Sequence, residues 1–232
     1  AAGLLARWDA INTRLGALEA VAHGMPSASR QPPAGPQQQQ QQRRGGIMPA
    51  GPPPSVTPGA SPTQQRLEQE LIAKGFTAAV FTRVPADYYD QPMEYRMRCL
   101  RAASVDHLCK SIVMENTKAH ASVDGWKDPR NSKYYLVLVQ YSARLATDKI
   151  NKFVWSMNSL GTKFYNMRLC KPEVNDQLTG FRHNAVSPVG MAEPDVPIIM
   201  SHKIAELQPP FFFMVGRRRG ERGALMGKGF PL

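Results

Sequence analysis

The sequence predicts an α/β domain with a mixed sheet flanked by helices. Between residues 61 and 215, short apolar runs rich in β-branched and aromatic side chains alternate with amphipathic segments, and this alternation is typical of α/β domains. The runs differ in length and spacing, which favours a mixed sheet. Residues 23–60 consist almost entirely of small, polar and proline residues, so the fold is expected to follow them.

Three segments lie outside the predicted domain. Residues 1–22 have apolar side chains at helical spacing and predict an amphipathic helix, which either docks on its own domain or acts as an interaction helix for a partner. Residues 23–60 contain six consecutive Gln and no aromatic residue. They cannot bury enough apolar surface to offset the entropy of ordering, and they predict a disordered Pro/Gln-rich linker. Residues 216–232 are interpreted as a basic C-terminal tail.

The first half of the domain contains two predicted helices and two predicted strands. Ser61 caps a helix over residues 64–74 that stops at a glycine. An apolar run over residues 76–84 predicts a strand that ends at a proline. Residues 93–100 predict a short helix, and the β-branched side chains within 107–115 predict the next strand.

The second half begins after a polar loop over residues 120–133. Residues 134–141, YYLVLVQY, are nearly all apolar and predict a central strand that is buried on both faces. Apolar residues at helical spacing predict a helix over 147–157. The remaining strands are predicted over 167–169, 196–200 and 211–215, and the remaining helices over 171–178 and 201–207.

Pattern alone also assigns several side chains to the core or to solvent. Glu68, within the first helix, is expected to be an ordinary solvated carboxylate. Tyr88 and Tyr89 lie beside a proline-containing turn and are expected to be exposed. The run Phe211–Phe213 is expected in the core rather than as a platform for base stacking.

The net charge of +11 is unevenly distributed. Residues 61–215 carry 19 basic and 15 acidic side chains, whereas residues 1–60 carry 5 and 2, and residues 216–232 carry 5 and 1. The excess favours a nucleic acid or another polyanion as partner, although solubility alone also explains it.

The cysteines and the hydropathy of the sequence indicate the cellular compartment. The three cysteines have no CxxC or Cys/His spacing typical of zinc, which fits a reducing environment. The sequence contains no run of 18 apolar residues, the length that a transmembrane helix needs, so no membrane partner is expected. We expect a cytoplasmic protein, or a mitochondrial one if a targeting peptide was removed, since the chain does not begin with Met.

The candidate site combines one lysine with one loop. Lys110 stands inside an apolar run, where its charge is costly unless the ammonium meets an anion; the alternative is an edge-strand lysine that reaches solvent. Residues 180–190 are rich in Gly, Ser, Pro and Asn, so their amides can approach a phosphate or a carbonyl oxygen. The same composition also makes an ordinary turn. Together they predict a pocket for an anion, such as the end of an RNA.

Two side chains of this loop could take part in hydrolysis. Ser187 would need a base to act as a nucleophile, and no G-x-S-x-G elbow surrounds it. A serine hydrolase is therefore not predicted. His183 is interpreted either as a hydrogen-bonded loop residue or as a substrate contact.

Three blocks of the sequence carry a family resemblance. HLCKSIVM (107–114), YYLVLVQY (134–141) and LTGFRHNAVSPVGM (178–191), in this order and spacing, resemble the YbaK/ProX-type aminoacyl-tRNA deacylases, which also occur as editing domains attached to prolyl-tRNA synthetase. The likeness runs from about Leu67 to Val215, and it looks like a eukaryotic stand-alone branch. It implies a single YbaK-like domain over residues 61–215 with a mixed, curved central sheet, and chemistry without a metal or cofactor.

The resemblance also implies a function and a set of site residues. The protein would be a trans-editing hydrolase that cleaves the ester between an amino acid and the 3′ adenosine of a mischarged tRNA. Lys110 occupies the position of the family's essential lysine, which contacts the tRNA end. The loop would hold the aminoacyl group and its ester carbonyl. Its catalytic positions are Gly180, Ser187 and Gly190, and its substrate contacts are His183, Asn184, Ala185, Val186 and Pro188.

A second interpretation is a catalytically inactive RNA- or protein-binding module within a ribonucleoprotein or synthetase complex, attached through residues 1–22. Two departures from the family pattern motivate it. Asn184-Ala185 stand where many members have two glycines, and Gly216 is followed by a cationic segment. That segment could grip a phosphate backbone with salt-dependent affinity, or it could be a solvated terminus. Its arginines are Arg217, Arg218, Arg219 and Arg222.

Overall fold

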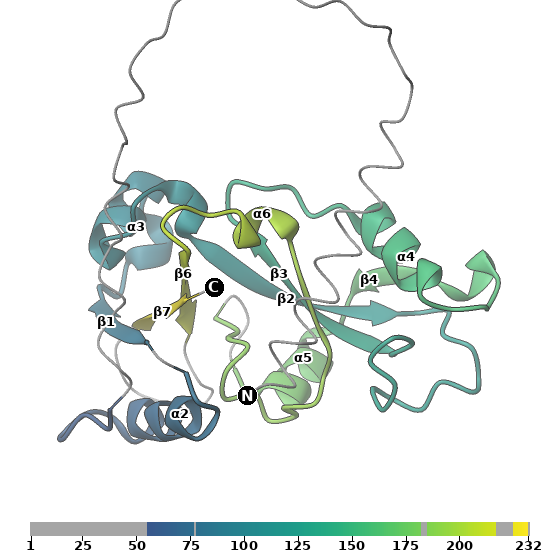
Figure 1. Ribbon diagram of the computed structural model, residues 1–232, viewed down its shortest axis with the longest axis horizontal. Coiled ribbons are helices and arrows are strands. Elements are labelled where there is room, and N and C mark those ends of the chain that lie inside the picture. Colours follow the sequence, from purple (N-terminus) through teal and green to yellow (C-terminus); the bar gives the residue numbers. More distant parts are fainter. Residues whose placement is uncertain (1–54, 77, 182–184, 217–224, 232) are drawn as a thin grey trace, which may run out of the picture. The chain divides into compact units, whose positions relative to one another are not determined.

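The computed structural model describes residues 55–76, 78–181, 185–216 and 225–231 (Figure 1). The predicted helix over 1–22, most of the predicted linker, and the arginines of the cationic segment lie outside these residues. Within them the chain has the predicted α/β class, with helices beside two sheets.

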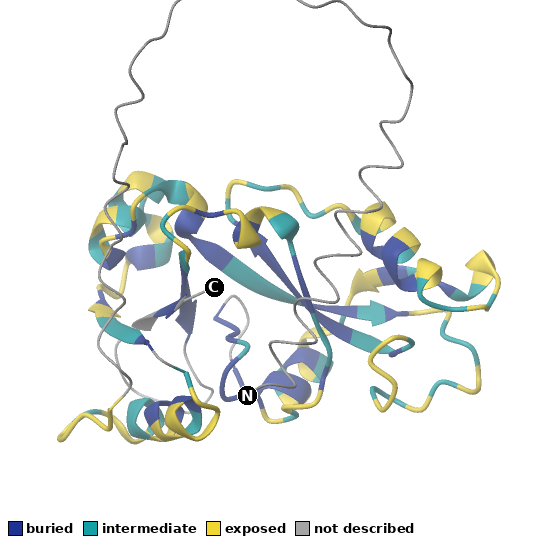
Figure 2. Cartoon of the chain, in the orientation of Figure 1, coloured by how far each residue is buried: buried dark blue, intermediate teal, exposed yellow. Residues whose placement is uncertain are grey.

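A four-stranded mixed sheet occupies the middle of the described residues, in the order β4-β2-β3-β5. Its strands are β2 (Cys109–Asn116), β3 (Tyr134–Gln140), β4 (Met167–Leu169) and β5 (Ile198–Met200). All neighbours are antiparallel except β3 and β5, which are parallel. Every residue of β3 after the first is buried, which confirms the predicted central strand (Figure 2).

A second, antiparallel sheet has three strands among the described residues, in the order β1-β7-β6. These are β1 (Val80–Val84), β6 (Phe211–Gly216) and β7 (Leu225–Pro231). An isolated parallel bridge between Leu108 and Phe213 links it to the start of β2.

Strand β7 corrects the interpretation of residues 216–232 as a tail. Residues 225–231 form the central strand of the second sheet, paired on both sides. The segment LMGKGFP contains two glycines and a proline, which are depleted in strands and hide the strand signal. Its pairing with β6, just before it in the chain, and with β1, more than a hundred residues earlier, decides its conformation.

The helices lie close to their predicted positions. They are α2 (Pro62–Ala73), α3 (Met93–Leu100), α4 (Thr147–Ser156), α5 (Pro172–Thr179) and α6 (His202–Ala205), with 3-10 turns η1 (Tyr88–Asp90), η2 (Val105–His107) and η3 (Thr162–Phe164). The Ser61 hydroxyl accepts a hydrogen bond from the Gln64 amide at 3.2 Å, and proline occupies the first turn of α2. These are the expected start signals for a helix. No helix within the described ranges is long and apolar enough to cross a bilayer.

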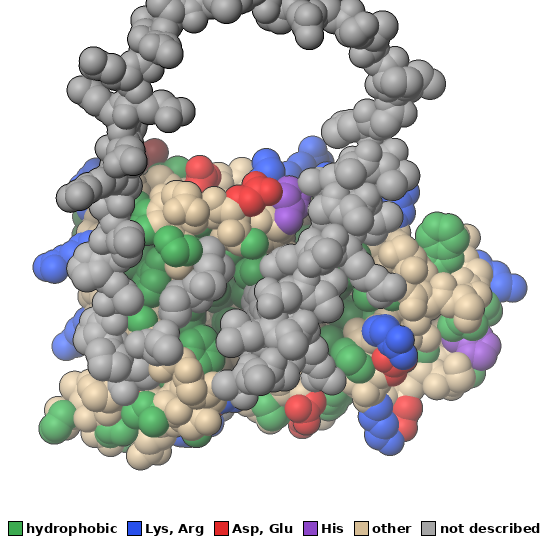
Figure 3. Space-filling model, in the orientation of Figure 1, with side chains coloured by type: hydrophobic (Ala, Val, Ile, Leu, Met, Phe, Trp, Pro, Cys, Tyr) green, Lys and Arg blue, Asp and Glu red, His purple; other side chains and the backbone are tan. Residues whose placement is uncertain are grey.

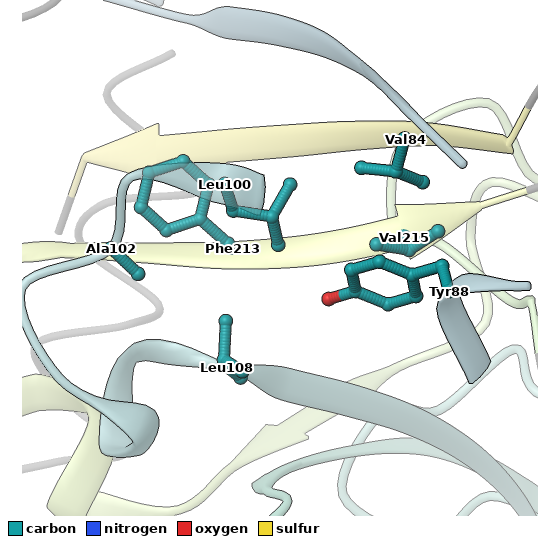
Figure 4. Close-up of a cluster of buried hydrophobic side chains, with 7 residues drawn as sticks. All are labelled: Val84, Tyr88, Leu100, Ala102, Leu108, Phe213 and Val215. Atoms are coloured by element: carbon teal, nitrogen blue, oxygen red, sulfur yellow. The ribbon is translucent and has the colours of Figure 1, made fainter. Parts of the chain in front are cut away.

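One core cluster packs α3, η1 and the start of β2 against the second sheet (Figure 4). Its members are buried apolar and aromatic side chains: Val84, Tyr88, Leu100, Ala102, Leu108, Phe213 and Val215. The expectation that Tyr88 is exposed is therefore wrong, and Tyr89 packs against the same cluster. Burial raises the pKa of the Tyr88 hydroxyl above its usual range. The predicted turn is present as η1, but tertiary packing buries the Tyr88 side chain within it.

Glu68 also departs from expectation, because its side chain is only 3% exposed. Its carboxylate accepts hydrogen bonds from the Thr57 amide at 2.7 Å, the Thr57 hydroxyl at 2.8 Å and the Gln64 side-chain amide at 2.8 Å. A buried carboxylate needs such donors. The segment before α2 is thus attached to the helix from Thr57 onward, a few residues before the predicted start of the domain.

Removing the hydroxyl group from each of two buried tyrosines should affect the free energy of unfolding differently. The Tyr135 hydroxyl accepts the Ser132 amide at 2.8 Å, so Tyr135→Phe should leave a buried donor unpaired and cost roughly 1–2 kcal/mol of unfolding free energy. The Tyr165 hydroxyl is buried and has no hydrogen-bond partner among the described residues, so Tyr165→Phe should be neutral or stabilising. Urea unfolding of the two variants tests the pair. A larger loss for Tyr165→Phe would contradict these assignments.

Candidate functional site

Lys110 lies on β2 and faces an aromatic ring rather than a carboxylate. In the β2–β3 register Lys110 stands opposite Val139, and the backbone amide of Tyr141 donates to Leu108 at 2.9 Å. Tyr141 is therefore the diagonal cross-strand neighbour of Lys110. The Lys110 ammonium lies 5.3 Å from the centroid of that ring, within the range of a cation–π contact. Lys110 is half-buried, and among the described residues no salt bridge involves its ammonium, so it can receive an anionic ligand.

Arg96 holds the ring that Lys110 contacts. Its guanidinium carbon lies 5.7 Å from the Tyr141 centroid, 5.7 Å from that of Tyr89 and 5.8 Å from that of Tyr88. The guanidinium also donates to the Gln91 carbonyl at 2.8 Å and to the Tyr89 carbonyl. These bonds fix Arg96, and Arg96 in turn holds the Tyr141 ring that Lys110 contacts, with the Tyr88 and Tyr89 rings around the same guanidinium. We call Arg96, Tyr88, Tyr89 and Tyr141 the tyrosine–arginine cluster.

The hydroxyls of this cluster are hydrogen-bond donors rather than bases. Burial raises the pKa of Tyr89 and of Tyr141 above their usual range. Both hydroxyls therefore stay protonated in neutral solution. Tyr89 donates to the Val215 carbonyl at 3.1 Å, which attaches the cluster to β6.

The loop after α5 is buried rather than open. Ala185, Val186 and Val189 are buried, and Pro188 is half-buried. Ser187 is 0% exposed, and its hydroxyl accepts the Val189 amide at 3.3 Å. The Ser187 hydroxyl therefore stabilises the turn. The predicted substrate contacts His183 and Asn184 lie outside the described residues.

Both glycines of the loop are required by the backbone or by packing. Gly180 ends α5 with φ 68°, and its amide donates to the Asp176 carbonyl at 2.9 Å; this is a typical left-handed helix cap. Gly190 has φ +81°, and a Cβ there would overlap Leu67 Cδ2 and lie 3.0 Å from Arg66 Nη2. The sequence predicted catalytic roles for both residues, and the geometry gives each a structural role as well.

Lys110 and the loop over residues 185–190 contact different parts of the structure. Lys110 contacts Tyr141, whereas the loop is attached to α5, where the Glu193 amide donates to the Leu178 carbonyl at 2.9 Å, and to α2 through the Arg66 guanidinium. No hydrogen bond or ion pair within the described residues joins Lys110 to the loop. Sequence analysis missed the tyrosine–arginine cluster, because only the strand register brings Tyr141 to Lys110.

Ser104 and His107 have the spacing of a nucleophile and its base, but they form a structural link. The Ser104 hydroxyl lies 2.9 Å from His107 Nδ1, and Nε2 lies 3.2 Å from the Pro209 carbonyl oxygen. Because a carbonyl only accepts, Nε2 carries the proton and Nδ1 accepts from Ser104. The buried imidazole thus attaches η2 to the segment before β6.

Two further features bear on chemistry. The cysteines Cys99, Cys109 and Cys170 are free, and burial raises the pKa of the Cys109 thiol to about 12. Its thiolate is therefore scarce at neutral pH. Within the described residues, no group of three or more His, Cys, Asp and Glu side chains is placed to hold a metal ion.

The fold defines the chain as an α/β protein of a kind already seen in solved structures. No protein-family model and no curated protein sequence matches the chain. A candidate trans-editing enzyme for prolyl tRNA synthetase is similar, with 24% identity and a TM-score of 0.50 over 72% of this chain and 87% of its own. A scaffold protein used for computational epitope grafting is similar at 20% identity, with a TM-score of 0.50 over 74% and 88%. At these identities the likeness shows the fold alone.

Proposed function

We propose that the protein is a trans-editing hydrolase that deacylates mischarged tRNA at the ester of the 3′ adenosine. The observation that carries the proposal is that Lys110 is a half-buried residue whose ammonium lies over the Tyr141 ring without a carboxylate partner among the described residues. Its charge is thus available for the ribose–phosphate end of a tRNA. The fold shared with a candidate trans-editing enzyme supports the same reaction.

In the proposed reaction, water adds to the ester carbonyl carbon and the bond from that carbon to the ribose 3′ oxygen breaks. The ribose oxygen takes a proton, and the free amino acid leaves as the carboxylic acid. Lys110 binds and orients the tRNA end, which holds the ester in place. Backbone amides within residues 185–187 polarise the carbonyl oxygen, since Pro188 has no N–H and the Val189 amide already donates to the Ser187 hydroxyl. The attacking water is positioned by backbone and substrate groups.

A second candidate function is binding without catalysis. The Ser187 hydroxyl is fully buried and occupied by the Val189 amide, so it is not free to activate a nucleophile. Gly180 and Gly190 have structural roles. An RNA- or protein-binding module, assembled with a synthetase or ribonucleoprotein through residues 1–22, would keep Lys110 as a ligand contact.

Deacylation of Ala-, Cys- and Ser-tRNA tests the first proposal. We expect Lys110→Met, which keeps the length of the side chain and removes its charge, to lower kcat/KM by roughly 30-fold or more, because the phosphate at the tRNA end then loses its cationic partner. Lys203→Met at an exposed position of α6 is the matched control and should keep activity within about twofold. If the wild-type protein binds tRNA but hydrolyses none of the three substrates, the non-catalytic function is correct.

A further inference from the structure

The basic excess of the domain is concentrated in one part of the sequence. Residues 116–171 contain ten basic and three acidic side chains, whereas the rest of residues 61–215 contains nine basic and twelve acidic ones. The rich segment includes α4, β4 and the loop between β2 and β3. A domain of small net charge therefore has one strongly basic region, which is typical of a surface that binds a polyanion.

Asparagine side chains join the parts of this region. Asn151 of α4 accepts the Met167 amide of β4 at 2.7 Å, and Asn158 donates to the Arg130 carbonyl in the loop at 2.8 Å. Asn116, at the end of β2, donates to the Phe164 carbonyl at 2.9 Å. The exposed side chains of these segments therefore have fixed backbone positions. We call this the α4–β4 surface, and its basic members with no salt bridge among the described residues are Lys118, Lys149, Lys152, Lys163 and Arg168.

Aromatic rings lie among these cations. The Lys163 ammonium lies 5.1 Å from the Phe164 ring centroid, and the His120 ring meets the same phenyl edge-on at 4.8 Å. Trp155 is 41% exposed on the outward face of α4, where it follows Lys152 at helical spacing. Figure 3 shows Lys, Arg and hydrophobic side chains together over α4. Trp155 is exposed and Phe164 is half-buried, and accessible rings among cations are the features with which proteins stack unpaired bases.

The acidic side chains nearby do not cancel this charge. Asp124, Asp128 and Glu115 each form a salt bridge with a basic side chain other than the five cations of the α4–β4 surface. The three contacts are Asp124–Lys127, Asp128–Arg130 at 3.8 Å and Glu115–Lys133 at 3.6 Å. Asp148, in the first turn of α4, lowers the excess charge by one and forms no salt bridge among the described residues.

We propose that the α4–β4 surface binds RNA, with its lysines on the phosphate backbone and Trp155 and Phe164 against exposed bases. The identity of that RNA as a tRNA rests on the proposed function. Lys110 and Asn116 are six residues apart on β2, so the surface begins roughly 20 Å from Lys110. One tRNA can therefore reach both, with its 3′ end at Lys110 and another part on the α4–β4 surface.

Binding of uncharged tRNA to the full chain tests this proposal, because it requires no ester. We expect the triple variant K118A/K152A/K163A to weaken binding at least about tenfold at low salt, and to reduce the slope of log K against log salt by roughly 2. The control triple K74A/R83A/K203A removes the same charge from exposed positions at the C-cap of α2, on β1 and on α6. It should leave the slope within about 0.5 of wild type, because these positions make no proposed phosphate contact.

Tryptophan fluorescence gives a second readout. Stacking of bases on Trp155 should quench the emission of the full chain when tRNA is added, and W155F should remove most of that quenching. Three results would each overturn the proposal: equal losses in the two triples, which would assign affinity to net charge; no tRNA binding by the wild-type chain; or binding to vesicles with anionic lipid that tRNA does not displace. The triple variant losing tRNA while the wild type hydrolyses no aminoacyl-tRNA would support this surface and reject the editing reaction.

Discussion

Replacing Gly190 with alanine should lower the free energy of unfolding by roughly 3 kcal/mol. Two effects add at this position. A φ of +81° costs a residue with a Cβ about 1–2 kcal/mol, and the new Cβ would overlap Leu67 Cδ2. Leu67 is 1% exposed on α2 and has little room to move, so overpacking adds about 1–3 kcal/mol. Urea unfolding followed by far-UV circular dichroism measures the change.

Gly125 provides the matched control for this prediction. Its φ is +56°, but a Cβ there would meet no atom within 4 Å, so Gly125→Ala should cost only the backbone term, about 1–2 kcal/mol. Adding Leu67→Ala to Gly190→Ala should cost less than the sum of the two single changes, because the overlap disappears. Equal losses at the two glycines would show that the loop does not pack against α2 as described.

This prediction also separates the two roles of Gly190. A structural glycine affects activity through stability, so Gly190→Ala should regain most of its deacylation activity per folded molecule at low temperature. A loss of activity in fully folded protein would instead favour the catalytic role that the family resemblance implies.

The elements that the sequence predicts well are those whose signals are local. Helix 93–100 and strand 167–169 have the predicted bounds, because spacing and punctuation decide them. Strand 134–141 was placed correctly, as β3 over Tyr134–Gln140, because a short apolar run rich in β-branched and aromatic side chains favours a buried strand over a helix. Strand β7 was missed, since its glycines resemble a loop and its pairing with β1 is long-range.

The candidate site likewise has one part with a local sequence signal and one part that only the fold brings together. A charged residue inside an apolar run identifies Lys110 from sequence, and the structure places it on β2. Its neighbours Arg96 and Tyr141 come from α3 and from the end of β3, and no spacing in the sequence links them to Lys110. Burial of Glu68 was missed for a related reason, because its donor Thr57 lies in a segment whose composition predicts disorder.

Asn116→Asp should destabilise the protein near neutral pH and recover at low pH. Asn116 is 1% exposed, its Oδ1 accepts the Asn166 amide at 2.9 Å, and its Nδ2 donates to the Phe164 carbonyl at 2.9 Å. A carboxylate keeps the first bond but turns an acceptor toward the Phe164 oxygen. Loss of the donor together with burial of a charge should cost roughly 3 kcal/mol at pH 7.

The sign of the pH dependence follows from the same contact. A protonated carboxyl group can donate to the Phe164 carbonyl, so the folded state favours the neutral form and raises the pKa of this carboxyl above its unfolded value of about 3.9. Stability is then present at low pH and lost as pH rises through the folded pKa. Asn116→Ala lacks both groups and should lose a similar amount at every pH.

Urea unfolding at pH 4.5 and pH 7, each referred to wild type at the same pH, makes the comparison. The deficit of Asn116→Asp should shrink by more than about 1 kcal/mol at the lower pH, whereas that of Asn116→Ala should stay constant. A deficit of the Asp variant that does not change with pH would contradict the bond to Phe164. Asn116 also holds the backbone of Phe164 on the α4–β4 surface. At pH 7 the Asp variant should therefore bind tRNA more weakly than expected from its one added negative charge alone.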